Sequence, residues 1–128
     1  MFPTIKDSDI LVIKKCKKNT EIVRGDIVAF YRFIETSKLF IKRVIGLPNE
    51  TIIWNSDGKI FVDNTYLDEP YALLQENTEH KWDLIEDSYL VLGDNRRNSE
   101  DGRKFGPLFR QEIIGKVIFS LKPFEKMK

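Results

Sequence analysis

The sequence predicts a mostly β fold, built from short antiparallel strands with little helix. Apolar residues recur with a period of two, in runs rich in Val, Ile, Phe and Tyr. Gly, Pro, Asn and Asp bound these runs, as they bound strands in known proteins. No segment carries a clean helical apolar face. We therefore expect antiparallel sheets that close into a barrel or pack as a pair.

The individual elements follow from these runs in chain order. Strands are expected at residues 9–15, 25–33, 39–47, 51–55, 59–64, 88–94 and 115–123. Ser56-Asp57-Gly58 predicts a hairpin between the fourth and fifth runs, and Asp63-Asn64 predicts a second tight turn. Residues 70–85 are expected to form an irregular excursion, and residues 109–114 a single helical turn.

Length and charge limit the function classes. The 128 residues indicate a single domain, 1–128. The 21 basic and 20 acidic residues nearly balance, and no polybasic run is present, so nucleic acid is not an expected partner.

The chain has one cysteine and one histidine, which argues against a metal site and against a Ser-His-Asp triad. Cys16 is the only cysteine, so it cannot form a disulfide within the chain, and it is expected to be half-buried in a strand. His80 is the only histidine, and its polar surroundings predict a surface loop rather than a catalytic triad. We expect no metal and no organic cofactor.

No segment approaches the roughly 18 apolar residues that a membrane-spanning helix requires. The first ten residues lack the basic start and apolar stretch of a signal peptide. As given, the chain is expected to be soluble, which leaves room for an anchor upstream of Met1 in a longer protein.

Lys42 is a candidate general base on physical grounds. It lies in an apolar run beside Arg43, and strand alternation sends the two side chains to opposite faces. A free lysine is neutral only about 0.04% of the time at pH 7, but burial lowers its pKa and makes it a usable base. The alternative is that both cations lie on an edge strand and extend into water.

The segment from Gly93 to Arg103 is rich in turn formers and charges and follows an apolar run directly. Such a composition predicts a tight loop held by its own hydrogen bonds, with internal ion pairs such as Asp101 with Arg103. Loops of this kind on a rigid sheet often carry function, although a purely structural surface loop remains the alternative.

Taken together, these segments resemble the type I signal peptidase family of Ser/Lys serine proteases. The matches are in order and cover essentially the whole chain. They comprise Met1-Phe2-Pro3-Thr4 from the box Ser-Met-x-Pro-Thr, the box from Arg24 to Phe30, the lysine box from Ile41 to Glu50, Asp68-Glu69-Pro70-Tyr71, the box from Gly93 to Arg103, and Ile114-Gly115-Lys116-Val117. Three positions depart from the family pattern: Ser8 and Asn49 replace glycines, and Gly102 replaces a serine.

The resemblance implies a partly open, barrel-like signal-peptidase fold and specific residue roles. Lys42 would be the general base, and Ser99 would hold its amine in place. Arg43 would pair with Asp94, and Asp101 with Arg103, as supporting ion pairs. Met1, Phe40 and Ile41 would line the shallow pockets that accept small residues before the cut.

The resemblance also implies a substrate and a location. The expected partners are signal peptides of exported preproteins, cleaved after Ala-x-Ala at the outer face of the cytoplasmic membrane. An upstream anchor would hold the full-length protein on that membrane.

The family's nucleophilic serine would stand immediately before Met1, where this sequence has no residue. The chain as given is therefore expected to be inactive, and Ser8, several residues away, is not expected to substitute. A truncated active enzyme and a non-catalytic homologue that binds or assembles exported proteins are the main explanations. A repressor-type Ser/Lys autoprotease and a plain β-barrel binding module are the remaining alternatives; the GDNR sequence argues against the repressor type.

Overall fold

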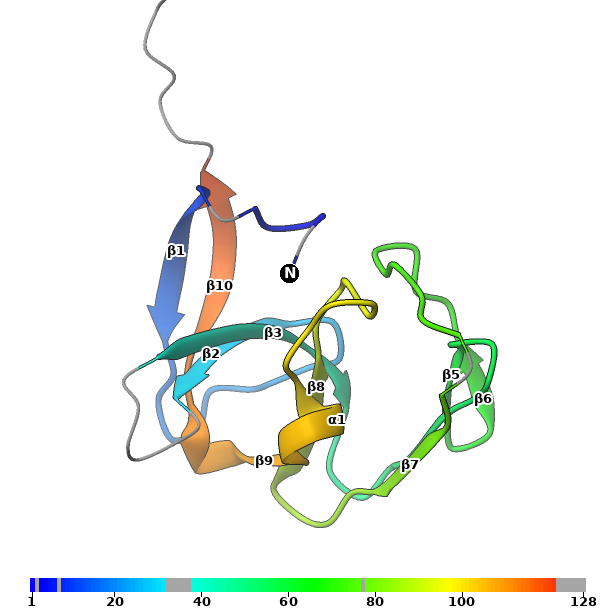
Figure 1. The fold of residues 1–128 in the computed structure, drawn as a ribbon. Helices are drawn as coiled ribbons and strands as arrows, with labels where there is room; N and C mark the ends of the chain where they lie inside the picture. Colours follow the sequence, from blue (N-terminus) through cyan, green and yellow to red (C-terminus); the bar gives the residue numbers. More distant parts are fainter. Residues whose placement is uncertain (2, 7, 32–37, 77, 122–128) are drawn as a thin grey trace, which may run out of the picture.

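Two antiparallel sheets form the protein (Figure 1). The computed structural model describes residues 1, 3–6, 8–31, 38–76 and 78–121. The larger sheet has the strand order β1-β10-β2-β3-β8-β9, and the smaller has the order β6-β5-β4-β7. The first sheet comprises β1 (Ile10–Lys15), β2 (Ile27–Tyr31), β3 (Leu39–Gly46), β8 (Ser88–Leu92), β9 (Leu108–Phe109) and β10 (Ile113–Leu121). The second comprises β4 (Thr51–Trp54), β5 (Ile60–Val62), β6 (Thr65–Leu67) and β7 (His80–Asp83).

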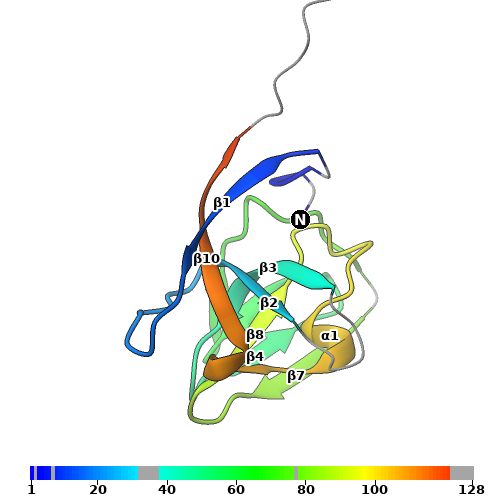
Figure 2. The same ribbon diagram turned by 90° about the vertical axis from the view of Figure 1, so that its left-hand side faces the viewer.

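The predicted mostly β class is confirmed, and the sheets form a pair rather than a closed barrel. All seven predicted runs contain a strand, namely β1, β2, β3, β4, β5, β8 and β10. Residues 32–33 and 122–123, at the ends of two of these runs, lie outside the described residues. In Figure 2, β1 and β10 run alongside each other and extend away from the rest of the sheet.

Both predicted turns are present, and their backbone angles explain their residues. Gly58 has a φ of 81° in the hairpin between β4 and β5, where a Cβ would come within 2.5 Å of the Gln75 carbonyl oxygen. Asp63 and Asn64 have φ values of 47° and 68° in the turn between β5 and β6. Both angles are of the sign that a two-residue hairpin turn with matching twist requires.

The prediction for residues 70–85 was partly wrong. Its second half contains β7, which pairs with β4, and His80 lies in that strand rather than in a surface loop. The His80 ring stacks on Trp82 at 5.3 Å and lies 5.4 Å from Trp54. Backbone pairing with β4 and the contact of His80 with Trp54 hold this strand in place, although its sequence is too polar and short to indicate one.

Helix is sparse, as predicted. The described residues contain only the four-residue α1 (Gly102–Phe105) and a 3-10 turn, η1 (Arg110–Glu112), which falls where a single turn was expected. None of the helices in the described ranges is long and apolar enough to cross a membrane. Cys16 follows β1 and is half-buried against the larger sheet's core.

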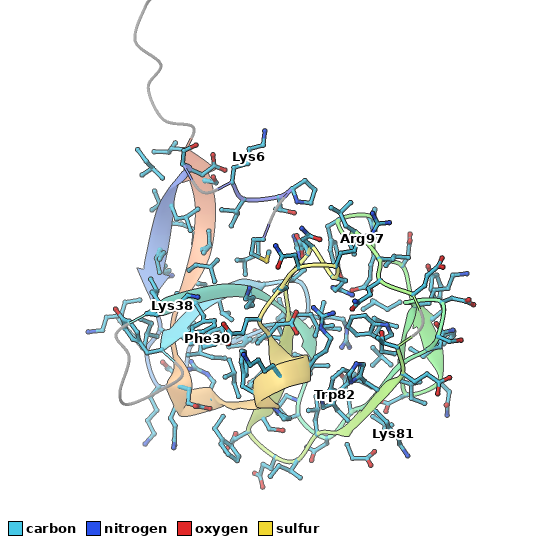
Figure 3. All side chains as sticks on the ribbon, in the orientation of Figure 1. Lys6, Phe30, Lys38, Lys81, Trp82 and Arg97 are labelled. Atoms are coloured by element: carbon cyan, nitrogen blue, oxygen red, sulfur yellow. The ribbon has the colours of Figure 1, made fainter. Side chains whose placement is uncertain are left out.

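The apolar residues form two cores, one for each sheet region. The first gathers around Phe30, Val44 and Val91, and the second around Trp54, Ile45 and Leu92. Figure 3 shows Phe30 within the larger sheet's core, whereas Trp82 and Lys81 point to opposite sides of β7. Because β3 and β8 contribute to both cores, the segment that follows β8 starts from a rigid base.

Candidate active site

The candidate site lies where β3 passes the end of β8. Lys42 is paired with Val28, and Arg43 with Ile27, in the β2–β3 ladder. Because side chains alternate along a strand, the two cations leave β3 on opposite faces. β8 ends at Leu92, beside Arg43, and the chain then enters the loop from Gly93 to Arg103.

Lys42 lies next to Ser99, as expected. The Lys42 amine donates a hydrogen bond to the Ser99 hydroxyl at 3.0 Å, and the lysine is half-buried. Within the described part of the chain, Lys42 has no carboxylate ion pair. Burial lowers the pKa of Lys42 more than the attraction of Asp101 raises it, and the nearby charges of Lys38 and Arg103 lower it further.

Arg43 meets Asp94 on the other face of the strand. Its Nε and Nη2 donate to the two oxygens of Asp94 at 2.9 and 2.8 Å, and Asp94 is fully buried. This bidentate geometry is the strong form of a guanidinium–carboxylate pair. Asp94 also accepts a hydrogen bond from the Thr4 hydroxyl. The pair therefore ties β3, the loop and the N-terminal segment together.

Asp101 organises the loop from inside. It is fully buried, caps α1 by accepting from the Arg103 backbone amide, and forms an ion pair with the Arg103 side chain at 2.8 Å. Its Oδ2 also accepts from the Gly93 amide at 2.9 Å. Burial opposes ionisation of Asp101, but the Arg103 side chain and these amides outweigh it and lower its pKa.

Gly93 provides the space in which Ser99 and Lys42 meet. A Cβ on Gly93 would lie 2.0 Å from the Ser99 hydroxyl and 3.6 Å from the Lys42 amine. The first of these contacts is impossible for a real atom. The backbone of Gly93 thus forms the wall against which both side chains rest.

The residues expected to bind substrate separate into two groups. Met1 and Ile41 line a cavity of about 350 Å³, together with Ile5, Lys6, Asp9, Leu11 and Leu39. Phe40 is absent from this lining; it is 5% exposed, stacks on Phe30 and meets Phe105 edge-to-face in the first core. The placement of Phe40 therefore supports a packing role. Ser8 lies exposed in a turn.

One buried ion pair was not predicted as part of the site. Arg96 and Glu69 are 0% and 8% exposed, and they pair at 2.6 Å. Both fall in segments that match the family, but nothing in the sequence indicates that they meet, because 27 residues separate them. The only sequence signal for this pair is that an acidic and a basic residue lie in the two family segments on either side of the excursion at residues 70–85.

Among the described residues, no group of three or more His, Cys, Asp or Glu side chains is placed to hold a metal ion. The chemistry available at the site is that of a desolvated amine hydrogen-bonded to a hydroxyl. Such an amine can accept a proton from a nucleophile and return it to a leaving group.

The comparisons with known proteins point to one family. The family model described as "Signal peptidase, peptidase S26" matches residues 1–122. A signal peptidase I from Leptolyngbya laminosa is 34% identical over 99% of this chain and 66% of its own length. A signal peptidase IB from Staphylococcus aureus strain Mu50 is 32% identical over the whole chain and 76% of its own length.

A solved structure agrees with these matches. The crystal structure of a signal peptidase I from Enterococcus faecalis V583 superposes with a TM-score of 0.65 and 28% identity. The match covers 77% of this chain and 97% of that structure. The family model, the sequence relatives and the solved structure all indicate the same family. The chain belongs to the signal peptidase (peptidase S26) family.

Proposed function

We propose that this chain is the catalytic core of a signal peptidase I in which Lys42 is the general base of a Ser/Lys dyad. The observation that carries the proposal is the environment of Lys42. Its amine is half-buried, lacks an acidic ion-pair partner among the described residues and is oriented by Ser99 at 3.0 Å. A lysine whose pKa burial has lowered is suited to accept a proton near neutral pH.

The nucleophile in this proposal is a serine placed immediately before Met1, as the family box has it. Neutral Lys42 takes the proton of the serine hydroxyl while the serine oxygen bonds to the scissile carbonyl carbon. The resulting ammonium then donates that proton to the leaving amine as the peptide bond breaks. A water molecule hydrolyses the acyl-enzyme by the same proton route.

Contacts of the N-terminal segment support this position for the serine. Thr4 is hydrogen-bonded to Asp94, which is paired with Arg43, the neighbour of Lys42. Met1 lines the same cavity as Ile41, the residue on the other side of Lys42. These contacts support a nucleophile close to the Lys42 amine. We further propose that substrates are signal peptides of exported preproteins, cut after Ala-x-Ala at the outer face of the cytoplasmic membrane, with an anchor outside residues 1–128.

The test compares two forms of the protein on a peptide that spans an Ala-x-Ala site, with products identified by mass spectrometry. The 128-residue chain should not cut, whereas a chain extended to place serine before Met1 should cut after the second alanine. In the extended chain, K42A and K42R should both lose activity, because a guanidinium does not deprotonate in proteins. The matched control is K81A, since Lys81 is exposed on β7, on the side opposite Trp82 (Figure 3), and the variant should retain full activity.

A non-catalytic homologue that binds exported chains is the competing function. It predicts that the extended chain binds the peptide without cutting it, and that K42A leaves binding unchanged. Cleavage by the 128-residue chain that persists in K42A would show that the assigned chemistry is wrong.

A further inference from the structure

A second segment, from Glu69 to Gln75, lies against the loop that carries Ser99. Figure 1 shows this green segment beside the yellow loop that follows β8. The Leu73 amide donates to the Asp94 carbonyl at 2.8 Å, and the Arg96 amide donates to the Leu73 carbonyl at 2.8 Å. Gln75 accepts from Arg103 at 2.9 Å. We call residues 69–75 the brace, because they hold the loop along its length.

The brace begins with a buried charge. Both oxygens of Glu69 accept from Arg96, at 3.1 and 2.6 Å, and the Tyr71 hydroxyl donates to Glu69 at 2.8 Å. Burial and the neighbouring Glu69 charge raise the pKa of Tyr71, so its hydroxyl keeps this proton at neutral pH. The Arg43 guanidinium lies over the Tyr71 ring at 4.0 Å, which links this cluster to the Arg43–Asp94 pair.

Arg96 transmits this anchor to the site. Its Nε donates to the Gly93 carbonyl at 2.7 Å, and its own carbonyl accepts from Arg103 at 2.6 Å. Gly93 is the residue whose Cα faces the Ser99 hydroxyl and the Lys42 amine. A continuous set of contacts therefore runs from Glu69 through Arg96 and Gly93 to the Ser99 hydroxyl and the Lys42 amine.

A fully buried ion pair is a weak source of stability, because desolvation of both charges offsets their attraction. In some proteins such a pair instead fixes one arrangement of the chain. Here the Glu69–Arg96 pair fixes the path of residues 93–96, because Arg96 also donates a directional hydrogen bond to the Gly93 carbonyl. An apolar pair in its place could not form that bond.

We infer that Glu69 is a positioning residue for the proposed Ser/Lys chemistry: through Arg96 and Gly93 it sets where Ser99 holds the Lys42 amine. This inference rests on the proposed function for its catalytic meaning. Its structural content, that Glu69 determines the environment of Lys42, stands independently and can be measured in the 128-residue chain.

The decisive variant is E69Q, read out by an NMR titration of the Lys42 side chain. The charged groups that act on Lys42 directly are Asp101, Glu100, Arg103 and Lys38. Loss of a negative charge alone would lower the pKa of Lys42 slightly. A loosened loop would admit water and raise that pKa toward the ordinary lysine value. The two effects have opposite signs, and positioning predicts a rise.

The matched control is E50Q. Glu50 forms another bidentate pair, with Arg24 at 2.7 Å for both contacts, and accepts from the Leu47 amide. E50Q should lose unfolding free energy in a denaturant titration without changing the pKa of Lys42. In the serine-extended protein, E69Q should lower kcat by about tenfold or more with little change in KM, and E50Q should not.

Y71F provides a milder variant in case E69Q does not fold. It removes one hydrogen bond to Glu69 without changing any charge, and it should raise the pKa of Lys42 by less than E69Q does. An unchanged or lowered pKa in the folded variants, or equal effects of E69Q and E50Q, would overturn the inference. If the extended wild type does not cleave, the proposed function fails, while the titration still decides the role of Glu69.

Discussion

Replacement of Gly93 by alanine tests the proposed site most directly, because the structure gives the size of the perturbation. The new Cβ would lie 2.0 Å from the Ser99 hydroxyl and 2.7 Å from its Cβ. To restore a contact of 3.0 Å, the hydroxyl must move by about 1 Å, which breaks its 3.0 Å hydrogen bond with Lys42. Gly93 is not among the residues with positive φ, so backbone strain does not complicate the substitution.

The expected loss is one of catalysis more than of stability. Overpacking of this kind lowers the unfolding free energy by about 1–3 kcal/mol. A displacement of about 1 Å in a positioning group can lower turnover by about 100-fold. In the serine-extended protein, kcat for an Ala-x-Ala peptide should therefore fall by that order, with KM nearly unchanged because G93A does not alter the cavity near Ile41.

G46A is the matched control for this prediction. A Cβ there would also overpack, at 2.6 Å from Leu84 and 2.9 Å from Ile52, but in the second core. Urea titrations should show comparable losses of unfolding free energy for the two variants, and only G93A should lose activity. Retention of wild-type kcat by G93A would refute the role assigned to Ser99.

Two further predictions concern charge and pH. In the serine-extended protein, K42M should abolish cleavage yet raise the unfolding free energy at pH 7 by roughly 0.5–2 kcal/mol, because it removes a desolvated ammonium. The folded pKa of Lys42 lies below the unfolded value near 10.5, so wild-type stability should rise with pH through that window, and K42M should lack this rise. D101N should lose a dependence of the same sign at low pH: the pKa of Asp101 is lowered in the fold, so its stabilising contribution is present above the unfolded value near 3.8 and disappears as pH falls through the lower folded value. Urea titrations from pH 2 to 11 would check both, and a K42M curve parallel to wild type above pH 7, or a D101N curve parallel below pH 5, would contradict them.

The sequence by itself predicted seven of the ten strands in the described residues and the direction of the key side chains. Period-two runs identified β3 and β8, and strand alternation placed Lys42 and Arg43 on opposite faces, because both signals depend only on neighbouring residues. The family resemblance supplied the partners of these residues, and the structure places Lys42 beside Ser99 and Arg43 on Asp94.

Only the tertiary structure decided how the loop is held. The polar strand β7 pairs with β4 and places His80 against Trp54, a partnership that no local pattern in residues 70–85 indicates. Likewise, Glu69 and Arg96 meet only because the brace folds back along the loop. Because both side chains are then buried, each charge needs the other as its partner. Contacts between residues distant in sequence depend on how the two sheets pack, and that packing is a property of the whole chain rather than of any segment.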